Sequence, residues 1–140
     1  MSRLIVSLLA FAFAIISLAF LPHDLSAQAV GESRELSAGR VRKNLGEGPA
    51  NVAGFEKVRV YEDTAQPGAA WATPPGGMPA PMFCTLLKGE LTVQVEGEGT
   101  KTYRAGDSWV CHVGQKTQAK STGAEPSVMP MHWLLRAGQR

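Results

Sequence analysis

Two stretches of the sequence decide how this chain folds. Residues 86–93 read Leu-Leu-Lys-Gly-Glu-Leu-Thr-Val, and residues 103–110 read Tyr-Arg-Ala-Gly-Asp-Ser-Trp-Val. In both, a glycine followed by an acidic residue stands between two short runs that favour strands. Glycine readily adopts the positive φ that a tight turn requires. Each stretch therefore predicts a strand, a turn and a second strand.

From residue 55 onward the rest of the chain follows the same plan. Short runs of strand-forming residues are separated by glycine and proline, with no convincing pattern for a long helix. Segment 71–81 is expected to be a loop, because it holds four prolines and proline cannot donate to a ladder. Such closely spaced short strands predict an all-β sandwich or barrel. The expected strands are 55–61, 82–87, 91–95, 101–104, 108–113, 117–121 and 128–135.

The first 29 residues resemble a secretory signal peptide. Arg3 precedes an apolar run over residues 4–21, and Ala27-Gln28-Ala29 offers a small-residue cleavage site. An uncleaved anchor is the alternative, because the apolar run approaches the ~18 residues that begin to span a bilayer. We expect cleavage, a periplasmic or secreted protein, and no membrane attachment afterwards.

Residues 30–140 suit one domain with one core. Segment 30–54 is rich in Gly, Ser, Arg and Glu without a clean period, so we expect a flexible N-terminal arm, followed by a barrel domain at 55–140. The formal net charge is +2, and only Arg40, Arg42 and Lys43 cluster. The chain lacks the dense basic surface that nucleic-acid binding needs.

The glycines at 89 and 106 lie at the spacing found in the two sequence motifs of the cupin family. Gly89-Glu90-Leu91 fits the end of the first motif and Gly106-Asp107-Ser108 the start of the second. The chain resembles this family over about residues 58–135. The resemblance implies a small cupin-type jelly-roll β-barrel, and also a homodimer in which N-terminal segments can be exchanged.

The resemblance also implies four metal-ligand positions, and none of them carries the family's ligand. The Glu position falls on Met82, the His-x-His pair falls within residues 75–78, and the last His position falls on Thr117. Cupin metal sites hold ions such as iron, manganese or zinc through imidazoles and a carboxylate. We therefore expect no metal of that kind and no cofactor.

Strand alternation predicts which residues face the interior. If Met82 keeps the inward position that the family gives it, every second residue of its strand is inward too, and Phe83, Thr85 and Leu87 face outward. The same register points Trp109 and Cys111 inward and places Thr117 near the mouth. The predicted ligand-binding residues that line the cavity are Met82, Cys84, Leu86, Trp109, Cys111 and Thr117.

Three hypotheses account for the two cysteines. Both are small buried side chains, as free cysteine often is, or they form a Cys84–Cys111 disulfide, which export would favour. The third is a soft-metal site for an ion such as copper(I), because thiolates and thioethers select soft ions. Its ligands would come from Cys84, Cys111, Met82 and Met78, with Met131 or His132 in addition.

No catalytic group stands out in the sequence. His112 is expected to face solvent and His132 to pack across strands, with His132 the one candidate for an interior base. The leading hypothesis is an exported, metal-free, non-catalytic barrel that binds a small apolar or aromatic molecule in the cell envelope. The alternatives are an enzyme with a non-standard site, either a soft-metal oxidase-like centre or a metal-free isomerase, and a structural module with an interface at Phe83, Thr85, Leu87 and Trp133.

Overall fold

The computed structural model describes residues 28–139, so the expected signal peptide at 1–29 lies almost wholly outside the described residues. Ten strands and no helix are found between residues 28 and 139, and hence no helix that could cross a membrane. The strands are β1 (Ser33–Ser37), β2 (Arg40–Val52), β3 (Phe55–Ala65), β4 (Ala70–Ala72), β5 (Met82–Thr85), β6 (Glu90–Val95), β7 (Gly99–Arg104), β8 (Ser108–Cys111), β9 (Thr117–Ser121) and β10 (Ser127–Leu135).

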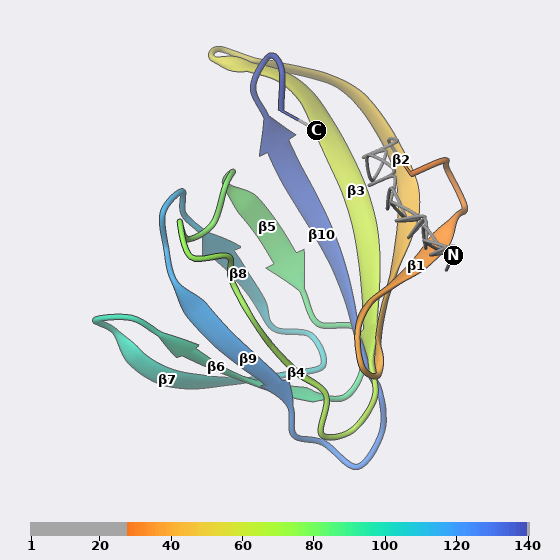
Figure 1. The fold of residues 1–140 in the computed structure, drawn as a ribbon, viewed down its shortest axis with the longest axis vertical. Coiled ribbons are helices and arrows are strands. Elements are labelled where there is room, and N and C mark those ends of the chain that lie inside the picture. The colour runs from red at the N-terminus through yellow and green to blue at the C-terminus, as the bar shows by residue number, and fades with distance from the viewer. Residues whose placement is uncertain (1–27, 140) are drawn as a thin grey trace, which may run out of the picture.

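The strands form two antiparallel sheets that face each other (Figure 1). The larger sheet has the order β1-β2-β3-β10-β5-β8, and the smaller has the order β4-β9-β6-β7. The long β2–β3 hairpin extends past the neighbouring strands at the top of Figure 1. The apolar core lies between the sheets and draws on β5, β6, β8, β9 and β10. This all-β architecture confirms the fold class expected from the turns.

Burial along β5 follows the predicted alternation. Met82 and Cys84 are buried, whereas Phe83 between them is exposed. The partner strands continue the pattern, because Phe83 lies directly opposite Val110 on β8 and His132 on β10, on the outer face. The inner and outer faces of this part of the sheet are therefore those that the sequence predicted.

Residues 30–54, expected to be a flexible arm, instead form β1 and β2. β2 pairs with β3 along most of its length, and a bulge near Gly46 shifts the register. In β2 the polar side chains are the more buried ones and the apolar side chains are exposed. Arg40, Arg42 and Asn44 lie on the inner side, while Val41 and Leu45 are exposed. A strand with polar residues on its inner side does not show the apolar period from which strands are recognised, so the local sequence concealed it.

Gly89 closes the β5–β6 connection against the chain that leads into β10. Its φ is +80°, and a Cβ at this position would lie 2.8 Å from the carbonyl oxygen of Pro126 and 2.8 Å from Cα of Ser127. Gly97, in the next hairpin, has a similar φ of +79° but open space around it. The two glycines thus separate the effect of backbone strain from that of a steric clash.

We expect Gly89→Ala to destabilise the fold more than Gly97→Ala. The left-handed conformation alone costs an alanine about 1–2 kcal/mol, and only at residue 89 must the backbone of 126–127 also move. Urea unfolding of both variants measures the difference. Equal losses of unfolding free energy would contradict the close packing at Gly89.

Candidate functional site: a cavity lined by sulfur and tryptophan

A cavity of about 270 Å³ lies between the two sheets. Its walls include all three tryptophans of the chain and every methionine and cysteine within residues 28–139. Aliphatic side chains of β6 and β9 form part of the opposite wall. The residues that matter below are Arg40, Arg42, Trp71, Met78, Met82, Cys84, Leu91, Val93, Trp109, Cys111, Thr117, Ala119, Met129, Met131 and Trp133.

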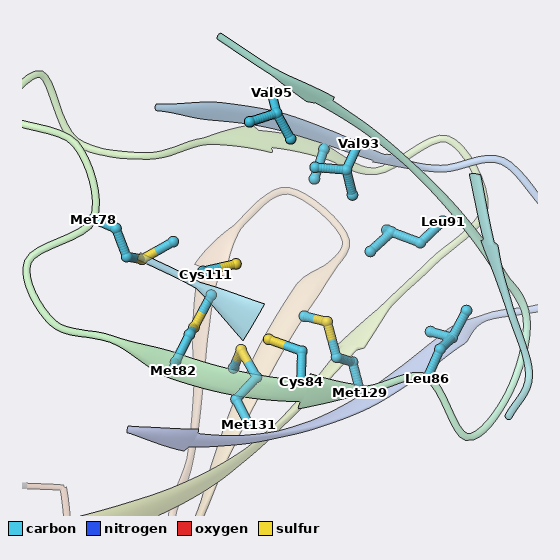
Figure 2. Packing of buried hydrophobic residues seen from close by; sticks show 11 residues of the cluster. Met78, Met82, Cys84, Leu86, Leu91, Val93, Val95, Cys111, Met129 and Met131 are labelled. Carbon is cyan, nitrogen blue, oxygen red and sulfur yellow. The ribbon is translucent and has the colours of Figure 1, made fainter. Parts of the chain in front are cut away.

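Five of the six predicted lining residues lie on this cavity, namely Met82, Cys84, Trp109, Cys111 and Thr117. Leu86 is fully buried but lies apart from the cavity, at the end of the core near Leu91 (Figure 2). β5 ends at Thr85, so Leu86 belongs to the turn, where its backbone bonds to Gly106 and Asp107. Whether the five bind a ligand stays a prediction.

Cys84 and Cys111 are both buried free thiols. Cys84 lies directly opposite Trp109, and Cys111 lies directly opposite Met82, so the two cysteines are diagonal neighbours. Diagonal pairs are about 7–8 Å apart, beyond the Cα separation of about 4.4–6.8 Å usual for a disulfide. A hydrogen bond with Cys111 and burial raise the pKa of Cys84, and the same bond lowers the pKa of Cys111.

The aromatic side chains form a second component of the site. The rings of Trp109 and Tyr103 are stacked, with centroids 4.0 Å apart and planes at 19°. Trp133, considered above for an outer interface, instead lines the cavity. Its indole Nε1 is buried and has no hydrogen-bond partner within residues 28–139. A buried donor without an acceptor is costly, so this atom marks a place for an acceptor atom.

The third component is a buried ion cluster that the sequence did not reveal. Asp63 on β3 is 1% exposed, and both Arg40 and Arg42 of β2 donate to it. Arg42 binds it in a bidentate manner, with Nε 2.7 Å from Oδ1 and Nη2 3.0 Å from Oδ2. Arg40 adds its Nε at 2.9 Å and its Nη2. Two guanidinium groups on one carboxylate leave one positive charge beside the cavity.

The arginines are also held by aromatic faces. The guanidinium carbon of Arg40 lies 4.3 Å from the ring centroid of Trp71, and that of Arg42 lies 4.8 Å from Tyr61 and 5.7 Å from Trp133. Burial lowers the pKa of Arg40, and the negative charge of Asp63 partly offsets this lowering. The sequence held one signal for this cluster, the spacing of Arg40 and Arg42 two residues apart, but their segment lacks the apolar alternation that predicts a strand.

The lining residues include no imidazole and no carboxylate. His112 is exposed, and the His132 ring lies on the outer face, 6.4 Å from Phe83, so His132 is not the interior base considered above. Within the described part of the chain, no three side chains of His, Cys, Asp or Glu could together hold a metal ion. The site can bind through apolar, cationic and sulfur groups.

We expect Asp63→Asn to lower the free energy of unfolding by about 3–5 kcal/mol, because it leaves two buried guanidinium groups without a counter-charge. Glu125→Gln is the matched control. Glu125 pairs with Lys88, and both side chains are more than half exposed, so the pair contributes about 0–1 kcal/mol. Urea denaturation compares the two variants. A loss for Asp63→Asn no larger than that for Glu125→Gln would refute the need of the two guanidinium groups for this buried counter-charge.

We also expect that neither thiol reacts quickly with Ellman's reagent in the native protein and that two thiols per chain react in guanidinium, because both are buried and unpaired. A protein purified under air without reductant is the sample that tests this. Fewer than two thiols after denaturation would show that the pair had been oxidised.

Comparisons with known proteins agree with the geometry. Residues 62–126 match the family model of the EutQ-like cupin domain. None of the curated proteins matches the sequence. Among solved structures, KdgF from Halomonas sp. has a TM-score of 0.58 and 18% identity, over 75% of this chain and 89% of its own. An RmlC-like cupin from Shewanella frigidimarina has a TM-score of 0.58 and 16% identity, over 80% and 93%.

At such identities the likeness to solved structures concerns the fold alone. The cupin domain of Schizosaccharomyces pombe Cnp3 is another similar structure. It has a TM-score of 0.55 and 14% identity, over 74% of this chain and 68% of its own. The family model, the two facing sheets and the turns at Gly89 and Gly106 agree with one another. The chain belongs to the cupin family.

Proposed function

We propose that this cupin is a non-catalytic binding protein whose barrel takes up a small aromatic molecule carrying an acidic group. The observation that carries the proposal is the composition of the cavity. Tryptophan rings and methionines line it, while Arg40, Arg42 and the indole of Trp133 supply its polar side.

The size and walls of the cavity favour a ligand with a single ring system. Ligand pockets commonly measure about 300–1,000 Å³, so a cavity of about 270 Å³ suits a small molecule. Indole faces provide large apolar contact area and stack on other rings. Trp71, Trp109 and Trp133 come from three different strands, so they offer such faces on more than one side of a guest.

The polar side of the cavity favours an anion. Each guanidinium uses Nε and Nη2 on Asp63, which leaves the Nη1 group of each for a further acceptor. Arginine matches the planar geometry of a carboxylate. A ligand carboxylate would offset the excess positive charge and could accept from Nε1 of Trp133.

Catalysis has little support, because the cavity wall offers no histidine, aspartate or glutamate to move a proton.

Export to the periplasm or beyond remains part of the proposal and rests on the sequence of residues 1–29. A homodimer also remains part of it. Phe83 and Val110 are exposed and directly opposite each other on the outer face, which gives a second copy an apolar surface to cover.

Nuclear magnetic resonance tests the binding directly, because the chain has three tryptophans and all three line the cavity. We expect benzoate or indole-3-acetate to bind saturably and to shift the Trp133 signal, which Trp133→Phe identifies. Benzamide, which lacks the charge, should bind at least about tenfold more weakly, since hydrogen bonds to charged groups contribute about 1.5–3 kcal/mol. Arg42→Gln should weaken benzoate binding by a similar factor.

Phe83→Ser is the control, because it changes only the outer face and should leave benzoate affinity unchanged. Equal affinity for benzoate and benzamide would refute the arginine subsite. Signal changes confined to the outer face, or no saturable binding of either acid, would refute the cavity as the site.

A further inference from the structure

Every sulfur-containing side chain within residues 28–139 borders the same cavity. Met82 and Cys84 come from β5, Cys111 from β8, Met129 and Met131 from β10, and Met78 from the loop before β5. Figure 2 shows these side chains extending from their separate strands into one shared space. The remaining methionine of the chain is Met1, outside the described residues.

The strand register explains why four of these sulfur atoms come close together. On the inner face, Met131 of β10 lies directly opposite Cys84 of β5, and Met82 of β5 lies directly opposite Cys111 of β8. Side chains at directly opposite positions have Cβ atoms about 4.5–5.5 Å apart. Two thiols and two flexible thioethers therefore share one patch of three adjacent strands.

Packing alone does not account for this arrangement. Methionine often fills gaps in a core, but here the methionines border an open volume that they do not fill. The facing wall of the cavity is built from Leu91, Val93 and Ala119 instead. Sulfur is thus concentrated on one wall, as expected for a set of ligands rather than for general filling.

We propose that this wall binds one copper(I) ion through Cys84, Cys111 and at least one of the thioethers of Met82 and Met131. Thiolate and thioether ligands select copper(I), whereas harder ions need imidazole, carboxylate or water. The residues that line the cavity include no imidazole and no carboxylate. Structural zinc sites use four thiolate or imidazole ligands, and only two thiols are present here.

The charges balance without any redox step. Copper(I) replaces the protons of the two thiols, which leave to solvent, and the resulting bis-thiolate centre carries one negative charge. The cluster of Arg40, Arg42 and Asp63 carries one net positive charge, and its two arginines border the same cavity. The net charges of the two groups are thus opposite in sign.

A route by which the ion reaches Cys111 from solvent is part of this proposal. Cys111 borders a second depression, at the edge between β7 and β8, which Glu98, His112 and Gln115 also line. His112 and Glu98 are exposed there and could take an ion from solvent before it reaches the thiols.

A copper(I) site lies beyond the proposed function and alters the expectation that the protein binds no cofactor. The expectation of no cofactor rests on the missing imidazole and carboxylate ligands, and for the ions that need those ligands it stays a prediction. Copper(I) was among the hypotheses for the cysteines, and the structure adds Met129 and the register of Met131 to its support.

Anaerobic titration of the reduced, purified protein with copper(I), in competition with bicinchoninate, tests the site. We expect one copper(I) per chain, near-ultraviolet thiolate-to-copper absorption, and an X-ray absorption spectrum with sulfur alone in the first coordination shell. Silver(I) should compete as a redox-silent substitute. Zinc(II) should not bind stoichiometrically.

Variants separate the ligands from the fold. Cys84→Ser with Cys111→Ser should abolish stoichiometric binding, and Met82→Leu with Met131→Leu, which nearly conserves volume, should weaken it at least tenfold. Trp133→Phe is the control: it changes the same cavity and should weaken benzoate binding while leaving copper(I) binding unchanged. Circular dichroism verifies that each variant is folded.

Binding of copper(I) to the double serine variant as tightly as to the native protein would overturn the site. A nitrogen or oxygen shell, or unchanged affinity in the double leucine variant, would overturn the mixed thiolate–thioether set. The copper(I) measurements use no benzoate. Failure of the copper(I) site and failure of aromatic-acid binding can therefore be told apart.

Discussion

The antiparallel register of β10, β5 and β8 determines which side chains share the interior of this cupin. Directly opposite positions place Met131 beside Cys84, and Met82 beside Cys111, on the inner face. Because successive residues of a strand point to opposite faces, a slip of one residue would exchange these for Phe83, Val110 and His132. The chemistry of the cavity therefore depends on the turns at both ends of β5, of which the one at Gly89 leaves no room for a Cβ.

The part of the fold with strong local signals was predictable from the sequence. Gly89 and Gly106 mark turns, and the strand expected over residues 117–121 is β9. The faces of β5 could be predicted because the cupin resemblance places Met82 inward and the residues after it alternate. The register implied by the resemblance, together with strand alternation, predicted the cavity residues Met82, Cys84, Trp109, Cys111 and Thr117. Leu86 keeps the predicted buried side but does not line the cavity, because it follows the end of β5 and lies in the turn that bonds to Gly106 and Asp107.

The sequence could not reveal what depends on distant pairing. Arg40 and Arg42 reach the cavity only because β2 pairs with β3, which brings them to Asp63 more than twenty residues away. Their strand buries charge and exposes Val41, the reverse of the usual pattern. The Asp63 carboxylate offsets the buried charge of these guanidinium groups, and only the folded arrangement brings the three side chains together.

The family's barrel is thus retained while the interior has changed from imidazole and carboxylate to sulfur, indole and guanidinium. Long-wavelength anomalous diffraction from crystals of the reduced protein tests the central claim most directly, because it locates each sulfur atom independently of the chain trace. We expect all sulfur peaks of the described residues to border one cavity, with the two cysteine peaks unbonded, namely those of Met78, Met82, Cys84, Cys111, Met129 and Met131. Peaks for Cys84 and Cys111 on opposite faces of the sheet, or joined in a disulfide, would contradict it.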